Sequence, residues 1–356
     1  MHIKRLTAVS VTVPYEAPLG PYIGRGGPPG SLGGHGLIVK IESDTGLVGW
    51  GEGTGQFETD PTDLLAGQHI ADIEKSTALM VDAGISRGPM SGIEMALWDL
   101  LGKAAGLPVC RLLGGVVRTE VDFCGCMGLK DPLESAATAE VYVDRWGFRF
   151  IKTKAGEDPA QDLAIAQAIQ HAVGQRTELR PDANAGYDVE TADAVMRQMR
   201  DLGVNYFEDP CDSEDPAVLA RIRRETGMHI LVNMRVGTAD SVVRLLQAEA
   251  ADSLMPDTPA AGGLLPVKKV ATVAAAWEVP CLMHCSHDLG LKTAAITHIA
   301  ASTPNFSGPN DTCYHGLTDD ILVEKLKIEN GKMAVPLGPG LGVEVDEGKI
   351  KKYRVG

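Results

Sequence analysis

The chain has 356 residues, 44% of them hydrophobic, so it can bury a large core as one α/β barrel or as two to three smaller domains. Its net charge of -14 and sequence pI near 5.1 would repel a phosphate backbone and an anionic membrane, and no long run of Lys or Arg offsets that repulsion. Nucleic acid and membranes are therefore not expected as partners.

The N-terminus and the cysteines indicate a cytoplasmic protein. The first residues, MHIKRLTAVSVTVPYEAP, alternate like a strand and lack the continuous apolar segment of a secretory signal. No 18-residue apolar span free of charges occurs in the chain. The seven cysteines have no paired spacing, which fits reduced thiols better than a disulfide framework.

Residues 1–118 predict an α+β capping domain. The segments HIKRLTAVSVTVP and HGLIVKIESDTGLVGWGEG alternate with period two around turn residues, which predicts an antiparallel meander, and SGIEMALWDLLGKAAG has helical period and a Gly stop. Between the two strand segments lies GPYIGRGGPPGSLGGHG, which is too rich in Gly and Pro for regular structure. Loops of this length are either lids or disordered.

Residues 119–322 predict a parallel (β/α) barrel of the modified (β/α)7β kind. Eight short apolar runs alternate with helical segments, and a parallel crossover needs such a helix. The runs are VDFCGCMG, FRFIKTKAG, TELRPDANAG, VNYFEDP, HILVNMRV, ADSLMPDTP, VPCLMHCS and FSGPNDTC. The repeat is short, so we expect a seventh or eighth strand to be irregular. The tail, residues 323–356, returns to strand patterning and is expected to pack on the capping domain.

Polar residues close most of these runs, at the end of the barrel where catalytic groups sit. Each has a structural explanation when taken alone: a lysine can be a solvated strand end, an aspartate a helix cap, and a histidine a core residue. The ordered series is harder to explain in that way. It comprises Lys152, Lys154, Asp182, Asn184, Glu208, Asn233, Asp257 and His284.

Asp182, Glu208 and Asn233 offer hard oxygen donors on three consecutive strands, which suits Mg²⁺ and not Zn²⁺. A magnesium ion flanked by a lysine and a histidine indicates abstraction of a proton α to a carboxylate. The metal would stabilise the enediolate while the two side chains move protons. The pattern leaves open whether Asp257 performs chemistry itself or supports another group.

These residues resemble the enolase superfamily, in the branch of mandelate racemase and glucarate dehydratase. The resemblance covers nearly the whole chain through IEMALWDLLGKAAGLPVCRLLGG, KTK, PDANAGYD, YFEDPC and AAGGLLPVKKVATVAAAWEVP. It implies that the capping domain and barrel hold one site between them. It also implies Mg²⁺ as the cofactor, a small carboxylic acid as the substrate and assembly as a homo-oligomer.

The resemblance assigns roles residue by residue. Lys154 matches the base of the second strand, with Lys152 beside it to lower its pKa and face the substrate carboxylate, and Asp182, Glu208 and Asn233 match the metal ligands. An aspartate at position 257, where other branches have lysine, implies a hydrogen bond to His284 that fixes the histidine tautomer. Asp257 is then a support for His284.

Further positions are expected to contact substrate. HCSHD could be read as a metal pair, but a structural or substrate-contacting role is favoured for its second histidine, His287. Cys313 stands where glucarate dehydratases have a histidine, and the N-terminal loop differs from theirs, so we expect a different specificity. The candidate substrate-binding residues are Asn184, Tyr22, Arg25, His35, His287, Asn310, Asp311 and Cys313.

The asparagine ligand and YFEDPC favour a hydro-lyase that dehydrates a sugar acid or small hydroxy acid to a 2-keto acid. The alternative is a racemase or epimerase of a 2-hydroxy or amino acid that uses the same lysine and His-Asp pair. A zinc hydrolase would need His-x-His on the first barrel strand, and DFCGCMG has none. A non-catalytic barrel would not need the full set of polar residues.

Overall fold

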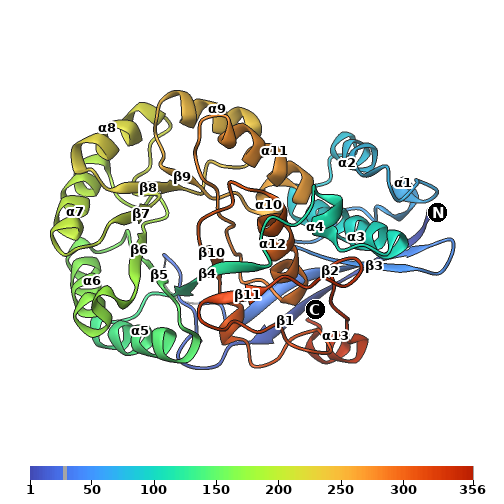
Figure 1. Ribbon diagram of the computed structural model, residues 1–356, viewed down its shortest axis with the longest axis horizontal. Helices are drawn as coiled ribbons and strands as arrows, with labels where there is room; N and C mark the ends of the chain where they lie inside the picture. The colour runs from blue at the N-terminus through green and yellow to red at the C-terminus, as the bar shows by residue number, and fades with distance from the viewer. Residues whose placement is uncertain (27–29, 356) are drawn as a thin grey trace.

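A computed structural model of the chain describes residues 1–26 and 30–355, and Figure 1 shows a barrel with a smaller domain against one side. The smaller domain begins with an antiparallel sheet in the order β1-β2-β3, as predicted. Its strands are β1 (Ile3–Pro14), β2 (Gly33–Ser43) and β3 (Val48–Gly53), and its helices are α1 (Thr62–Leu65), α2 (Ile73–Asp82), α3 (Arg87–Ala105) and α4 (Val109–Leu112).

The close packing of α3 on β3 depends on glycine. A Cβ atom at Gly51 would lie 2.1 Å from the carbonyl oxygen of Gly92, which is backbone and cannot move aside easily. The alternating glycines of GLVGWGEG therefore bring the helix against the sheet.

The barrel sheet has the order β10-β4-β5-β6-β7-β8-β9, and all neighbouring strands in it are parallel. The seventh strand is reduced to a bridge between Leu254 and Cys281, and the Asp311 amide donates to the Met283 carbonyl at 2.8 Å to continue the wall. This confirms a (β/α)7β barrel with an irregular seventh strand. The strands are β4 (Glu120–Met127), β5 (Phe150–Lys154), β6 (Glu178–Asp182), β7 (Tyr206–Glu208), β8 (His229–Val232), β9 (Ser253–Leu254) and β10 (Asn310–Thr312).

Helices surround the barrel, and several begin with an Asp-Pro pair. In three helices the N-cap residue is an aspartate whose side chain accepts hydrogen bonds from first-turn amides, and the first helical residue is a proline. The aspartates are Asp131, Asp158 and Asp215. Both residues of each pair therefore specify where the helix starts. The helices are α5 (Pro132–Trp146), α6 (Pro159–Val173), α7 (Val189–Asp201), α8 (Pro216–Thr226), α9 (Ala239–Gln247), α10 (Thr258–Ala261), α11 (Leu264–Ala275) and α12 (Gly290–Ser302).

Two buried glutamates of the smaller domain cap barrel helices. Glu94 on α3 accepts the amides of Leu264 and Leu265 at 2.8 and 2.9 Å, at the start of α11. Glu52 on β3 accepts the amides of Leu289 and Lys292 at 2.7 and 2.8 Å, at the start of α12. Because α12 lies between the barrel and the smaller domain, every one of its residues is buried.

The tail packs on the capping domain as expected, but its strand pairs with the barrel. Its predicted strand patterning yields, among the described residues, one short strand, β11 (Lys332–Ala334), which pairs with β4 of the barrel and not with the capping domain. The chain then forms a helix, α13 (Glu347–Tyr353), that contacts β1, and the Val355 amide donates to the Ser10 carbonyl at 3.0 Å. The tail thus contacts both parts of the molecule.

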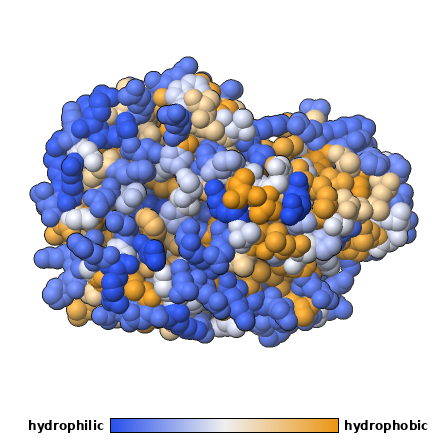
Figure 2. Space-filling view, in the orientation of Figure 1, coloured by the Kyte–Doolittle hydropathy of each residue, from blue (hydrophilic) through white to orange (hydrophobic). Residues whose placement is uncertain are grey.

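The surface differs between the two parts. On the face in Figure 2, hydrophilic residues cover most of the barrel, whereas hydrophobic residues gather on the side of the smaller domain. No helix in the described part of the chain has the combination of length and hydrophobicity needed to cross a bilayer.

The cap at α11 should make stability depend on pH. Burial raises the pKa of Glu94 to about 7, although its amide donors oppose the shift. The folded state therefore binds more protons than the unfolded chain between about pH 4.5 and pH 7, so this group's contribution falls as pH rises through that range, by about 3 kcal/mol. The loss is complete only well above pH 7, where Glu94 is ionised in the folded state as well.

Urea unfolding of the wild type and Glu94→Gln at a series of pH values tests this prediction. The difference in unfolding free energy between the two proteins should shrink as pH rises from 4.5 to 7. A surface substitution such as Glu347→Gln should leave the wild-type pH dependence unchanged. If the curves of the wild type and Glu94→Gln run parallel, the raised pKa is wrong.

Candidate active site

The strand register places the predicted residues in one row at the barrel mouth. Lys154 on β5 pairs with Asp182 on β6, and Asp182 pairs with Glu208 on β7. Since registered neighbours in a parallel sheet point to the same face, the three side chains lie side by side inside the barrel. Lys152 pairs with Arg180 one layer deeper on the same face.

A buried ion-pair network lies below this row. The Lys152 ammonium contacts Glu208 Oε1 at 2.7 Å, Asp311 Oδ2 at 2.9 Å and Asp182 Oδ2 at 3.1 Å. Arg180 Nε contacts Glu208 Oε2 at 3.0 Å, and its guanidinium also binds Asp311. The network thus contains two cations, Lys152 and Arg180, and three carboxylates, and all of them are buried.

The network controls the protonation of its members. Burial alone would lower the pKa of Lys152, but Asp182, Asp311 and Glu208 raise it well above the ordinary value. Burial would raise the pKa of Asp182, but Lys152 and Lys154 lower it. Lys152 is therefore a fixed ammonium and Asp182 a fixed carboxylate.

Lys154 is the more accessible of the two lysines. Its ammonium donates to Asp182 Oδ2 at 2.6 Å and to Asn184 Oδ1 at 2.7 Å, and 11% of its side chain is exposed. Lys152 contacts the same oxygen of Asp182, so the two positive charges lie close together.

Carboxylates at the ends of β6 and β7 could hold a metal ion. Oxygens of Asp182, Glu208 and Asp209 lie within 4.8 Å of one another, and these hard donors fit a cation of the magnesium type. Asn233 donates its side-chain amide to the Met255 carbonyl at 2.8 Å, and its Oδ1 accepts no hydrogen bond from the residues that the structure describes. That oxygen is available for the predicted role as a ligand.

Asp209 was not among the predicted ligands. It accepts the backbone amides of Asn233 and Met234 at 3.1 and 3.0 Å, so it anchors the loop after β8. Burial and the nearby Asp182 raise the pKa of Asp209 to about 6. The sequence signal was present in YFEDP, where two acids are adjacent.

Asp257 contacts His284 as the resemblance implied. His284 Nδ1 lies 2.9 Å from Asp257 Oδ2, which also accepts from the Ser286 hydroxyl at 2.5 Å. The buried Lys292 ammonium lies 2.6 Å from the other oxygen, Asp257 Oδ1. Burial opposes ionisation, but Lys292 and His284 lower the pKa of Asp257, so it remains a carboxylate. The other nitrogen of His284 is left for chemistry.

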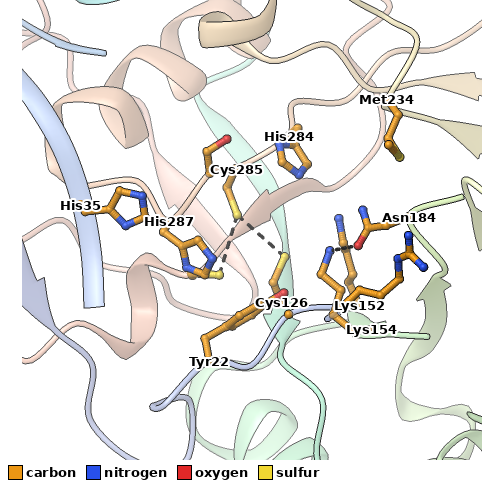
Figure 3. Close-up of a pocket in the computed structure, with 14 residues that line it drawn as sticks. Tyr22, His35, Cys126, Lys152, Lys154, Asn184, Met234, His284, Cys285 and His287 are labelled. Carbon is orange, nitrogen blue, oxygen red and sulfur yellow. Dashed lines mark hydrogen bonds between the residues drawn. The ribbon is translucent and has the colours of Figure 1, made fainter. Parts of the chain in front are cut away.

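Several of the predicted residues line a cavity of about 490 Å³, and Asp182, Glu208, Asn233 and Asp257 lie outside its lining. In Figure 3, Lys152, Lys154 and Asn184 lie on one side, and His35 and His287 lie on the other. The cavity is lined by Tyr22, Gly24, Arg25, His35, Cys126, Lys152, Lys154, Asn184, Met234, His284, Cys285, Ser286, His287 and Cys313.

Described residues of the N-terminal loop, among them Tyr22, Gly24 and Arg25, line the cavity, and residues 27–29 of the loop fall outside the described ranges. Tyr22 and Ser31 exchange backbone hydrogen bonds of 2.9 and 2.7 Å, and the Leu129 amide donates to the Ile23 carbonyl at 2.7 Å. The loop therefore brings Tyr22 and Arg25 to the cavity.

His287 joins this loop region to the barrel. Its Nδ1 lies 2.9 Å from the Tyr15 hydroxyl, and its ring packs against Tyr22 and His35 with centroid distances of 4.6 and 5.6 Å. Burial lowers the pKa of His287 to about 3, so it stays neutral. It is not grouped with His284 in any of the potential metal clusters of the described residues.

Two predicted substrate contacts, Asn310 and Asp311, are not among the residues that line the cavity. Asn310 is buried and does not line the cavity, because its side chain accepts from the Met283 amide and donates to the Asp122 carbonyl at 2.8 and 3.2 Å. Asp311 is also buried and does not line the cavity, because it pairs with Lys152 and Arg180, although its carboxylate lies within 4.8 Å of a His284 ring nitrogen. Their position after the eighth run was right, but both side chains serve the barrel wall.

Sequence reasoning missed two buried cations. Arg180 lies two residues before Asp182 and therefore shares its face, a signal that period-two alternation could have given. Lys292 lies four residues after Asp288 and pairs with it at 2.8 Å within the first turns of α12. Its partner Asp257 is far away in sequence, which no local pattern indicates.

The comparisons with known proteins agree with this arrangement. Residues 134–349 match the model of the enolase C-terminal domain-like family, and residues 35–114 match that of the mandelate racemase / muconate lactonizing enzyme N-terminal domain. The chain is 30% identical to a protein named probable glucarate dehydratase from Streptomyces coelicolor, covering 88% of this chain and 83% of that protein.

Relatives also include isomerases. The chain is 29% identical to L-Ala-D/L-Glu epimerase of Bacillus subtilis, covering 86% of this chain and 88% of the epimerase. A crystal structure of an enolase from Streptomyces coelicolor is 28% identical and superposes with a TM-score of 0.88 over 99% of this chain and 96% of that one. The chain therefore belongs to the mandelate racemase / muconate lactonizing enzyme family of the enolase superfamily.

Proposed function

We propose that the protein is a Mg²⁺-dependent hydro-lyase that removes the proton α to a carboxylate and dehydrates a sugar acid or small hydroxy acid to a 2-keto acid. The observation that carries the proposal is that Lys154 and His284 line one cavity. Asp257 is bonded to His284, Asp182 contacts Lys154, and the Glu208 carboxylate lies near His284. Two proton-transfer groups with different partners suit a reaction that removes the proton from the α-carbon and delivers a proton to the hydroxyl on the β-carbon.

In this proposal Lys154, as the neutral amine, takes the α-proton, and the electron pair forms the enediolate. His284, as the imidazolium, gives its proton to the β-hydroxyl, which leaves as water while a carbon–carbon double bond forms. The resulting enol tautomerises to the 2-keto acid. Asp257 supports the imidazolium by its charge and by the hydrogen bond to Nδ1.

Asp182, Glu208 and Asn233 would hold the Mg²⁺ ion, which supplies positive charge to the substrate carboxylate and to the enediolate. Lys152 adds a second fixed positive charge at the same side of the cavity. Arg25 and His35, which line the cavity near its mouth, are proposed to contact the hydroxyl groups of the substrate.

A screen of sugar acids and smaller hydroxy acids with Mg²⁺ tests the proposal by detecting 2-keto acid. We expect product only from substrates with a β-hydroxyl and loss of activity after chelation. Racemisation of acids without a β-hydroxyl, with no keto acid from any substrate, would overturn the dehydratase assignment.

Epimerisation is the second candidate, because the same pair of groups can pass a proton through the enediolate when no leaving group is present. The likeness to an epimerase supports it. Proton nuclear magnetic resonance of candidate acids in deuterated water distinguishes the two reactions. Epimerisation yields the inverted epimer with deuterium at its α-carbon, whereas dehydration yields a 2-keto acid and no inverted epimer.

Asp257→Asn should impair the histidine-dependent step and leave metal binding intact. The amide keeps the shape of the carboxylate but not the charge that supports the imidazolium, so we expect kcat to fall by about 10²- to 10⁴-fold. The measurements are steady-state kinetics and calorimetric titration with Mg²⁺. Asp288→Asn is the control, because Asp288 contacts Lys292 but not His284. Loss of Mg²⁺ affinity in Asp257→Asn would show that Asp257 belongs to the metal site.

A further inference from the structure

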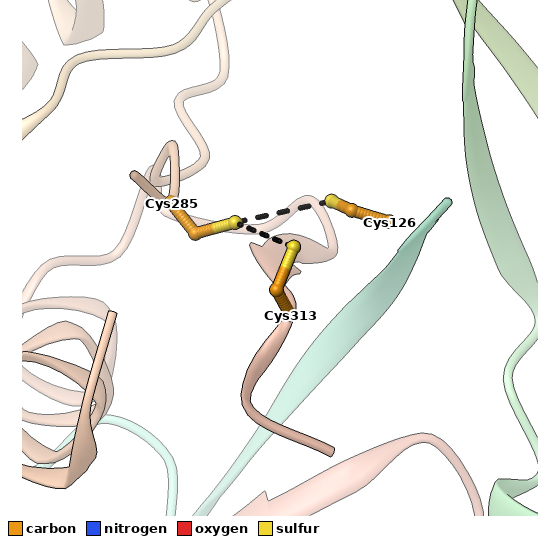
Figure 4. A group of neighbouring side chains, drawn as sticks. All are labelled: Cys126, Cys285 and Cys313. Atoms are coloured by element: carbon orange, nitrogen blue, oxygen red, sulfur yellow. Dashed lines mark hydrogen bonds between the residues drawn. The ribbon is translucent and has the colours of Figure 1, made fainter. Parts of the chain in front are cut away.

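Three cysteines meet at the wall of the catalytic cavity, and the proposed reaction uses none of them. Cys285 Sγ lies 4.0 Å from Cys126 Sγ and 3.9 Å from Cys313 Sγ, and the three sulfur atoms lie within 4.8 Å of one another (Figure 4). All three side chains are buried, yet all three line the cavity.

The barrel register explains why the thiols meet. Thr312 on β10 pairs with Gly125 on β4, so Cys313 and Cys126 follow at the same height on adjacent strands. The backbone bond between Asp311 and Met283 places the seventh strand beside β10, which brings Cys285 next to Cys313. Three consecutive positions around the barrel thus each supply one thiol.

The spacing of the thiols matches that of a mononuclear thiolate site. Zinc–sulfur bonds of about 2.3 Å place two sulfur ligands about 3.8 to 4.0 Å apart in tetrahedral or trigonal geometry. The two measured separations, 3.9 and 4.0 Å, fall at this spacing without movement of the backbone. The cavity side of the cluster leaves a position for water or a substrate oxygen as a further ligand.

The surroundings can offset the charge of such a site. Cys126 is the register partner of Lys152, a fixed ammonium, and the Arg180 guanidinium lies one strand further on in the same row. Three thiolates and a divalent cation carry one net negative charge. Lys152 and Arg180 already face three carboxylates, so a Mg²⁺ ion bound by those carboxylates would supply the positive charge that offsets it. The three thiols and the carboxylates of Asp182 and Glu208 should bind different ions, because soft sulfur donors and hard oxygen donors prefer different metals.

We propose that Cys126, Cys285 and Cys313 form a second metal site for one thiophilic divalent cation, such as Zn²⁺ or Cd²⁺, at the wall of the catalytic cavity. Binding breaks three S–H bonds, forms three metal–sulfur bonds and releases three protons to the solvent, so no oxidant is needed. The ion would lie next to His284 and reduce the space for substrate. Occupancy of this site does not depend on the proposed dehydration.

The test is titration of the full-length protein with Cd²⁺ in saturating Mg²⁺ and a phosphine reductant, followed by the ultraviolet sulfur-to-cadmium charge-transfer band. One equivalent of Cd²⁺ should produce the band in the wild type and in Cys281→Ser, a control at a buried cysteine of the same strand. Cys285→Ser should abolish the band, because Cys285 is the thiol shared by both short separations.

A second measurement uses the wild type alone, in case Cys285→Ser does not fold. Bound Cd²⁺ should slow alkylation of Cys126, Cys285 and Cys313, identified by peptide mapping under mild denaturant, and should not slow alkylation of Cys110 or Cys281. The proposal is overturned if the folded wild type gives no charge-transfer band, or if Cys285→Ser keeps the band, or if protection does not favour the three cluster cysteines.

Discussion

Lys154→Ala is expected to abolish exchange of the substrate α-proton with solvent and to lower turnover by about 10²- to 10⁴-fold, the contribution typical of one general base. The reason is geometric, since Lys154 is the lysine with access to the cavity, whereas Lys152 is fixed by three carboxylates. Alanine leaves no group on that side of the cavity that can take the proton. The measurement is deuterium incorporation into recovered substrate, together with kcat.

His284→Asn gives the complementary result. Asparagine can keep a hydrogen bond near Asp257 but cannot protonate a leaving hydroxyl, so dehydration should be lost while α-proton exchange continues. If exchange is lost in His284→Asn and kept in Lys154→Ala, then the roles of acid and base are reversed. Lys130→Ala is the matched control, because Lys130 follows β4 at the same barrel mouth but does not line the cavity.

Arg180→Met should cause the largest loss of stability, about 3 to 5 kcal/mol of unfolding free energy. Arg180 is 4% exposed and contacts both Glu208 and Asp311, so its removal leaves two buried carboxylates with Lys152 as their remaining cation. Methionine keeps most of the side-chain volume, which separates the loss of charge from the creation of a cavity. Urea unfolding measures the change.

A double variant tests whether charge is the cause. Arg180→Met combined with Asp311→Asn should regain part of the stability, because one of the unpaired carboxylates is neutralised. Arg197→Met is the surface control, since Arg197 pairs with Asp193 in water and should contribute little. Additive losses in the double variant would show that packing, and not charge, makes Arg180 important.

Periodicity predicted the architecture because each barrel unit is local. A short strand, a polar end and a helix that begins at an Asp-Pro pair are all encoded within about 25 residues. The same logic placed Lys154, Asp182 and Glu208 at one end of the barrel. The tail was harder, since α13 is a short helix beside β1 whose conformation depends on packing between the two ends of the chain.

The sequence did not predict the direction in which some side chains of the site point. Asn310, Asp311 and Cys313 follow one another at the end of β10, yet only Cys313 lines the cavity. The seventh strand is irregular, so alternation gave no reliable face for Cys285. The meeting of three cysteines from sequence positions 126, 285 and 313 needed the closed barrel, because they lie far apart in the sequence and on three different strand positions.

The two glutamate caps have a consequence for how this enzyme can be rebuilt. Glu94 and Glu52 satisfy backbone donors at the starts of α11 and α12, so those helices lack their caps in a barrel expressed alone. A chimera that joins this barrel to the N-terminal domain of a relative would need a carboxylate at the positions of Glu94 and Glu52, whatever loop the new domain brings to the cavity. The two caps thus tie the barrel to its own N-terminal domain through two named side chains.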